Sequence, residues 1–283
     1  MMNIFKMQMM VICMEMDGSQ FVLKNFIIMI MKIGVNDLKG EDSMKMTENK
    51  NYYMTEIDAK VARDLIKKYH YSHKVVPNSK LHLGVFDKKT NQLVGVLQYG
   101  TPMNATKTPQ KIVSNSNQYE MYELNRMAMI DEAPKLSESQ AISLSFKFIK
   151  RYYTNIKWLL SFSDGKEGNV GTIYQATNWI YLGYRESDSF YELDGEIWHN
   201  VQIWHKFKEG KDIKTMDALN DNFNNISKIT SKQHIYVMPL TENINFLLER
   251  QPYPKKDTET RIIKRRIIKE NGKMLDKPKT IVY

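Results

Sequence analysis

The sequence predicts an α/β (α+β) protein with a central mixed sheet flanked by helices and a basic C-terminal extension. The first observation is the apolar run 158–162, which ends in Ser163-Asp164-Gly165 and precedes a helical pattern that starts at Gly171. A buried strand that delivers polar side chains at its carboxyl end, just before a helix, is typical of α/β sheets. The other two observations are the alternation of strand and helix patterns and the concentration of positive charge after residue 249.

The first half of the pattern predicts four strands and one helix. Strands are expected over 52–56, 81–86, 93–99 and 119–130, with a polar hairpin loop at 87–91 and a longer polar loop at 100–118. A helix over 58–69 places Val61, Leu65 and Ile66 on one face, and Asp58 is its predicted N-cap.

The second half predicts two more helices and three more strands. A helix over 137–153 begins with Ser137 and Gln140 at the spacing of a capping box. A strand over 157–163 and a helix over 171–182 follow. Two aromatic-rich strands, 189–194 and 197–207, are expected to form a hairpin around Asp194-Gly195.

Composition limits the kind of partner. A net charge of +9 and a pI of about 9.2 favour an anionic partner such as nucleic acid. The single cysteine, Cys13, excludes a disulfide framework within one chain, which fits a reducing compartment. The apolar run 26–31 is too short to cross a bilayer, so no membrane partner is expected.

The predicted order of strands and helices resembles the GNAT acyltransferase fold. Two local stretches are also similar: the strand 123–127, and the end of the last helix at 180–184. Two features depart from those enzymes. The segment between Ile130 and Gln140 contains no glycine where they carry a glycine-rich phosphate loop, and Trp179 stands where they usually have a tyrosine acid.

A closer resemblance accounts for these departures. It rests on the order and spacing of five short motifs: His70-Tyr71-Ser72, Glu123-Leu124-Asn125-Arg126, Ser137-x-Ser139, Ser163-Asp164-Gly165 and Tyr174. Together they resemble the bacteriophage Mom family over roughly residues 50–255. These GNAT-like proteins convert adenine in phage DNA to a methylcarbamoyl-type N6 adduct and so protect it from host restriction. The resemblance implies a DNA-modifying transferase in the cytoplasm of the host cell, with acetyl-CoA or a related acyl-CoA as cofactor.

The resemblance assigns catalytic roles to His70, Tyr71, Asp164 and Tyr174. A histidine can act as a base near neutral pH, although one at a helix C-terminus is also favoured by the helix dipole. Tyr71 is either a core aromatic or a phenol that orients a base, and Asp164 either a site residue or a turn residue before Gly165. If His70, Asp164 and Tyr174 converge on a metal, their hard or borderline donor atoms suit iron.

Arg126, Ser137 and Ser139 are the predicted cofactor-binding residues. Arg126 lies within a strand and either pairs with an acidic residue or grips an anionic cofactor. Serines at a helix N-terminus are most often caps, yet the free backbone N–H groups there form an anion site that needs no glycine.

The C-terminal third carries the predicted DNA contacts. From residue 249 to 283 there are eleven Lys and Arg against five Asp and Glu. The run 261–269 alternates basic residues with isoleucine pairs, which fits either a helix or a basic strand. Because adenine N6 is reached only in an exposed base, an aromatic pocket is expected, with Trp179, Trp198 and Trp204 as candidates.

Three segments are predicted. Residues 1–46 contain eleven of the nineteen methionines and are interpreted as an untranslated leader or a disordered extension, with initiation at Met44 or Met46; the alternative is a helical extension. Residues 47–210 form the GNAT-like catalytic domain, and 211–283 a basic extension partly packed on the core. The alternative functions are an acetyl-CoA-dependent N-acetyltransferase on a small-molecule or protein amine, and a non-catalytic DNA-binding protein. The sequence leaves the oligomeric state open.

Overall fold

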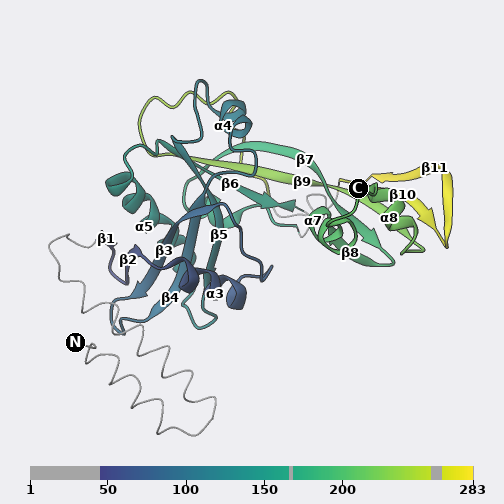
Figure 1. Ribbon diagram of the computed structural model, residues 1–283. Coiled ribbons are helices and arrows are strands. Elements are labelled where there is room, and N and C mark those ends of the chain that lie inside the picture. Colours follow the sequence, from purple (N-terminus) through teal and green to yellow (C-terminus); the bar gives the residue numbers. More distant parts are fainter. Residues whose placement is uncertain (1–44, 166–167, 256–262, 283) are drawn as a thin grey trace, which may run out of the picture.

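The computed structural model describes residues 45–165, 168–255 and 263–282, so the leader predicted at 1–46 lies almost entirely outside the described residues. The described residues form one eleven-stranded sheet with helices on its faces (Figure 1). Its strands are β1 Met46–Glu48, β2 Tyr52–Glu56, β3 Ser79–Asp87, β4 Leu93–Gly100, β5 Met121–Met129, β6 Trp158–Asp164, β7 Ile180–Leu193, β8 Glu196–His199, β9 Ile226–Pro239, β10 Lys264–Glu270 and β11 Lys273–Val282. The helices are α3 Ala59–Tyr69, α4 Lys107–Ile112, α5 Ser137–Tyr152, α6 Thr172–Ala176, α7 Asn200–Ile203, the π-helix η2 Trp204–Lys208 and α8 Thr215–Asn220. The predicted mixed sheet flanked by helices is confirmed.

The strand order is β1-β2-β3-β4-β5-β6-β9-β10-β11, with the β7–β8 hairpin joined through β9. All neighbours are antiparallel except β5 and β6, which run parallel. The parallel pairing covers only three residue pairs, from Met121 with Trp158 to Glu123 with Leu160. Beyond Glu123 the two strands are no longer paired, so the sheet opens at their carboxyl ends.

Helices α3 and α5 cover opposite faces of the sheet. Successive side chains of a strand point to opposite faces. Accordingly Val96 of β4 packs with Ala62 and Ile66 of α3, whereas its neighbour Leu97 belongs to the core cluster that contains Ile142 of α5. The side-chain oxygen of Asp58 accepts a hydrogen bond from the Lys60 backbone N–H at 2.7 Å, so the N-cap predicted for α3 is confirmed.

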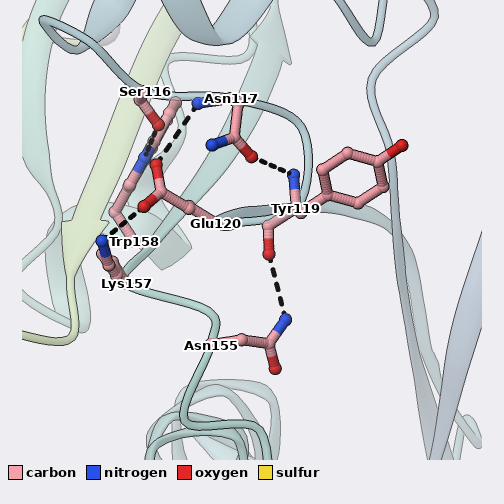
Figure 2. Close-up of polar contacts among 7 residues, drawn as sticks. All are labelled: Ser116, Asn117, Tyr119, Glu120, Asn155, Lys157 and Trp158. Carbon is pink, nitrogen blue, oxygen red and sulfur yellow. Dashed lines mark hydrogen bonds and ion pairs between the residues drawn. The ribbon is translucent and has the colours of Figure 1, made fainter.

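A polar turn fixes the start of the parallel pair (Figure 2). The Glu120 carboxylate, just before β5, accepts hydrogen bonds from the Lys157 ammonium and from the Asn117 backbone N–H. Trp158, the first residue of β6, donates its indole N–H to the Ser116 hydroxyl at 2.9 Å. The two strands are therefore held together at their amino ends, which leaves their carboxyl ends as the place where they separate.

Strands β7 and β9 are long and carry the sheet away from α5 toward β10 and β11, as the right side of Figure 1 shows. Asp194 and Gly195 have φ values of 46° and 91° and connect β7 to β8, so the predicted hairpin turn is confirmed. The second strand is shorter than predicted because His199 caps helix α7, where its ring accepts the Val201 N–H.

Three local predictions are wrong. The helix predicted over 171–182 stops at Ala176, because Asn178 takes a left-handed φ of 60° and the following apolar residues pair with β9 as strand β7. Residues 180–184, which resembled the end of a helix, are the first residues of strand β7. The capping box is absent: Leu136 is the N-cap of α5, and the Gln140 side chain accepts from Asn51 instead. The loop predicted at 100–118 contains helix α4.

The region after residue 210 is more than an extension. Strand β9 pairs with β6 along seven residues, from Trp158 with Pro239 to Asp164 with Gln233. Strands from both sides of the expected boundary at 210 therefore belong to one sheet, and the boundary itself stays a prediction. The basic run is a strand from Lys264 onward, which settles the choice between helix and strand; Arg261 and Ile262 lie outside the described residues. None of the helices in the described ranges is both long and apolar enough to cross a membrane.

Candidate active site

A cavity of about 690 Å³ opens where β5 and β6 part. Its walls come from β5, β6, the end of α3, the N-terminus of α5, the β6–α6 loop and β9. Gly171 in that loop has a φ of +72°, and a Cβ there would come within 2.5 Å of the Tyr236 ring, so only glycine lets the loop turn into α6 at this point. The cavity lies at the carboxyl ends of the parallel strands, the position at which α/β sheets bind ligands.

Six of the seven predicted site residues line this cavity: His70, Tyr71, Arg126, Ser139, Asp164 and Tyr174. They come from five separate parts of the chain, and only the fold brings them together. The seventh, Ser137, lies elsewhere. It is buried, and its hydroxyl is hydrogen-bonded to the Tyr52 hydroxyl and the Pro134 carbonyl, both at 2.6 Å. Ser137 therefore anchors α5 to β2 and is not among the residues that line the cavity.

His70 is held as a neutral hydrogen-bond donor. Its Nδ1 atom accepts the backbone N–H of Ser72 at 3.1 Å and lies 2.9 Å from the Ser72 hydroxyl. Because a backbone N–H can only donate, Nδ1 is unprotonated and the neutral ring carries its proton on Nε2. Burial lowers the pKa of His70 to about 4, and the positive charge of Arg126 acts in the same direction. At neutral pH, His70 can offer an N–H to a ligand but cannot accept a proton at Nε2.

The described residues give no independent support for an iron site. Tyr174 accepts a hydrogen bond from the Ser161 hydroxyl at 2.8 Å, and burial raises its pKa to about 12. Neither nitrogen of His70 offers a free lone pair. Among the residues that the structure describes, no group of three or more His, Cys, Asp or Glu side chains is placed to hold a metal ion.

Asp164 and Tyr71 both line the cavity but differ in their exposure to solvent. Asp164 ends β6 and is half-buried, and its charge acts on both Tyr71 and His199. The Tyr71 side chain is 79% exposed, so it is not the core aromatic that was one of its two interpretations.

Glu123 is a cavity residue that the sequence did not predict as a site residue. It belongs to the last parallel pair, lines the cavity, and has a pKa of about 7 because burial disfavours its charged form. Asn125, Arg126 and Arg185 act in the opposite direction and favour the carboxylate. A carboxyl group that titrates near neutral pH in a cavity is a candidate general base. The sequence signal for Glu123 was its place in the 123–126 motif, three residues before Arg126.

Arg126 is fixed against the wall of the cavity. Its Nε donates to the Lys74 carbonyl at 3.2 Å and one terminal nitrogen donates to the Asn125 carbonyl at 2.7 Å. Ser139 turns its hydroxyl back to the Leu136 carbonyl at 3.0 Å. Leu136 itself has a φ of 70°, so the chain adopts at this turn a conformation that favours glycine, although no glycine is present.

The aromatic and basic surfaces differ from the sequence prediction. None of the three candidate tryptophans lines the cavity: Trp179 is fully buried, Trp198 packs against Phe207 and Phe223, and Trp204 borders a separate hollow beside η2. Several basic residues of β10 and β11 are already engaged. Lys264, Arg265 and Lys279 pair with glutamates, and Lys269 donates to two backbone carbonyls.

Similar solved structures include the ribosomal-protein-S5-alanine acetyltransferase from Vibrio fischeri, with 10% identity, a TM-score of 0.39 and coverage of 70% of this chain and 97% of that one. A GNAT-family acetyltransferase from Bacillus anthracis has 11% identity, a TM-score of 0.36 and coverage of 69% and 98%.

The family follows from sequence. The Mom protein family matches residues 51–255, and the chain belongs to this family. A relative, the methylcarbamoylase mom of Escherichia phage Mu, is 43% identical over 143 residues. That match covers 50% of this chain and 58% of the relative.

Proposed function

We propose that this protein is a phage DNA-modification enzyme that converts adenine N6 in DNA to a methylcarbamoyl-type adduct in the host cell and so protects the DNA from restriction. Membership of the Mom family is the observation that carries the proposal. The name of the phage Mu relative, a methylcarbamoylase, supports the kind of group transferred. The cavity between β5 and β6 supports an enzyme rather than a non-catalytic DNA-binding protein, because it brings an acid–base carboxyl and a fixed N–H donor together.

Glu123 is the proposed general base. The exocyclic amine of adenine is a weak nucleophile and must lose a proton as it reacts. In the proposed step the N6 nitrogen forms a bond to the carbonyl carbon of a thioester whose acyl group already carries the N-methyl nitrogen, and the thiolate leaves with the electron pair of the broken C–S bond. One proton of the amine passes to the Glu123 carboxylate, which is ionised above about pH 7.

His70 is the proposed donor to the charge that develops on the electrophile. Its Nε2–H cannot remove a proton, but it can donate a hydrogen bond to a carbonyl oxygen that gains negative charge. A positioned neutral donor of this kind stabilises the transition state more than the ground state. The proposal therefore reverses the base role that the sequence suggested for His70.

The proposed cofactor is an acyl-CoA, which would supply the activated carbon. Two features of the cavity suit such a donor. The positive charge of Arg126 can attract its phosphates, and the backbone N–H groups near Ser139, at the N-terminus of α5, can bind an anion. Glu138, which also lines the cavity, opposes binding of phosphate at this turn. No step is assigned to iron, which has no independent support among the described residues.

The test is mass spectrometry of nucleosides from the DNA of cells that express the chain. We expect a new adenosine adduct with the wild type, little or none with Glu123→Gln, and wild-type levels with Glu132→Gln, a matched change at an exposed glutamate. Unmodified DNA with an acetylated amine product would support an N-acetyltransferase instead. Neither product, with salt-sensitive DNA binding, would support a non-catalytic DNA-binding protein.

A further inference from the structure

The cavity has one exposed aromatic residue on its wall. The aromatic side chains that line it are Tyr71, Phe162 and Tyr174, together with the ring of His70. Phe162 and Tyr174 are half-buried and His70 is buried, whereas Tyr71 is 79% exposed. Its ring is therefore accessible to a ligand that enters the cavity, and an aromatic ring can stack on a flat ligand.

One face of the Tyr71 ring is supported from behind. It stacks on the His70 ring with a centroid distance of 4.3 Å and an angle of 30° between the planes. His70 is in turn fixed by the backbone N–H and the hydroxyl of Ser72. The stacked pair therefore presents the other face of Tyr71 on a rigid base, which reduces the side-chain entropy lost when a ligand stacks there.

Two cationic residues, Arg126 and Lys74, lie near Tyr71, together with the carboxylate of Asp164. Arg126 lies close enough for its charge to act on Tyr71, and its Nε atom binds the carbonyl of Lys74. Lys74 is exposed in the loop that follows Tyr71. Cations beside an exposed aromatic ring are the combination with which proteins hold unstacked bases, the cations on the phosphates and the ring on the base.

We propose that Tyr71, backed by His70, is the stacking platform on which the unstacked target base rests as it enters the cavity. This inference rests on the proposed function and adds to it the form of the substrate: a base that is already single-stranded or has been extruded from the duplex. The ring, not the phenolic hydroxyl, provides the contact. Tyr71 then acts as a substrate-binding residue rather than as the phenol that orients a base, which was the role suggested by the sequence.

The experiment uses the full chain and a 21-nucleotide thymidine strand with one central 2-aminopurine, whose fluorescence falls when it stacks on an aromatic ring. The variants are Tyr71→Phe, Tyr71→Leu and Tyr119→Leu. Tyr119 is a matched control because it is 69% exposed and does not line the cavity. We expect quenching with the wild type, Tyr71→Phe and Tyr119→Leu, and none with Tyr71→Leu. In Tyr71→Leu the affinity for the strand should fall about 5- to 150-fold, the range for loss of one base–aromatic stack.

Four results would overturn the inference. Equal quenching in Tyr71→Leu would place the base elsewhere, and absence of quenching in the wild type would show that no base stacks there. Quenching abolished by excess coenzyme A would assign the ring to the adenine of the donor. A Tyr71→Phe variant that loses modification as fully as Tyr71→Leu would assign the role to the hydroxyl. Because quenching needs no chemistry, it remains readable even if no modified adenosine is found, so failure of the proposed function is distinguished.

Discussion

The Ser72 backbone N–H donates to the Nδ1 atom of His70 at 3.1 Å, and this single contact decides what the histidine can do. It places the proton of the neutral imidazole on Nε2. Any role for His70 in the cavity is then that of a donor, and the base must be sought elsewhere. Glu123, with a pKa of about 7, is the group in the cavity that suits that role.

Replacement of His70 tests the donor role. We expect His70→Ala to lower the rate of adenine modification by about 10²- to 10³-fold, the usual effect of losing one donor to a developing oxyanion. His70→Gln should retain more activity because its amide can still donate.

A separate substitution tests the carboxylate at the end of β6. We expect Asp164→Ala to lose modification with the fold intact. Rates are measured by mass spectrometry of nucleosides and the fold by circular dichroism; wild-type rates in His70→Ala would remove the residue from the mechanism.

The pH dependence of the reaction reports the ionisation of Glu123. Since burial raises its pKa to about 7, the carboxylate forms only above that pH. We expect kcat/KM to rise about tenfold per pH unit below pH 7 and to level off above it. Glu123→Gln should lose about 10²- to 10⁴-fold and show no such rise. A profile that is flat from pH 5 to 8 in the wild type would exclude Glu123 as the base.

Glu123 should also affect the stability of the fold, and its contribution to the free energy of unfolding should decrease as pH rises. Between pH 4.5, its ordinary pKa, and about 7, the folded state binds more protons at Glu123 than the unfolded state does. The contribution of Glu123 to the free energy of unfolding therefore falls as pH rises through this window. Glu123→Gln should remove that fall, which denaturant titrations at pH 5 and pH 8 would measure.

Lys269 is predicted to stabilise the part of the sheet farthest from α5. It is 9% exposed, and its ammonium donates to the carbonyls of Asn220 at 2.7 Å and Phe223 at 2.8 Å, at the end of α8. Lys269→Met should lower the free energy of unfolding by about 1–3 kcal/mol, because the carbonyls lose a charged partner. Lys273→Met, at an exposed position, should change it by less than about 0.5 kcal/mol. Equal effects in urea denaturation would contradict this role.

Local patterns predicted most of the first six strands and the two long helices, because α3 and α5 have strong periodic apolar faces and their strands are bounded by polar turns. The errors lie where tertiary pairing overrides local preference. The 171–182 segment has a helical pattern, yet Tyr181 and Leu182 gain more by pairing with β9 and entering the core. No local sequence pattern indicates the pairing with β9, because β9 lies more than forty residues further along the chain.

Most of the site residues that the sequence predicted line the cavity, but their protonation states were not predicted. Short motifs identified His70, Arg126, Asp164 and Tyr174, all of which line the cavity, while their roles stay predictions. The protonation of His70 depends on a contact with Ser72, and the pKa of Glu123 depends on burial by residues far away in the sequence. Neither property is visible before the chain is folded. Ser137 also belongs to one of the motifs, but its side chain is hydrogen-bonded to Tyr52 and anchors helix α5.

The contribution of the C-terminal strands to DNA binding is best tested by point substitution. Deleting residues 257–283, the obvious test from sequence, would also remove β10, which pairs with β9 and carries Ile268 against a core cluster. Within the described residues, three exposed cations of β10 and β11 make no ion pair: Arg266, Lys273 and Lys277.

Changing these three to alanine should leave the fold and the cavity intact while weakening DNA binding. If all three contact phosphates, the slope of log affinity against log salt should become shallower by about 2.7 on duplex DNA or about 2.1 on a single strand, at 0.9 or 0.7 per contact. The matched control is alanine at Lys264, Arg265 and Lys279, whose charges are already neutralised by glutamates, so the slope should change less. An unchanged slope in the first variant, measured by fluorescence anisotropy at 50–200 mM salt, would rule out these strands as part of the DNA-binding surface.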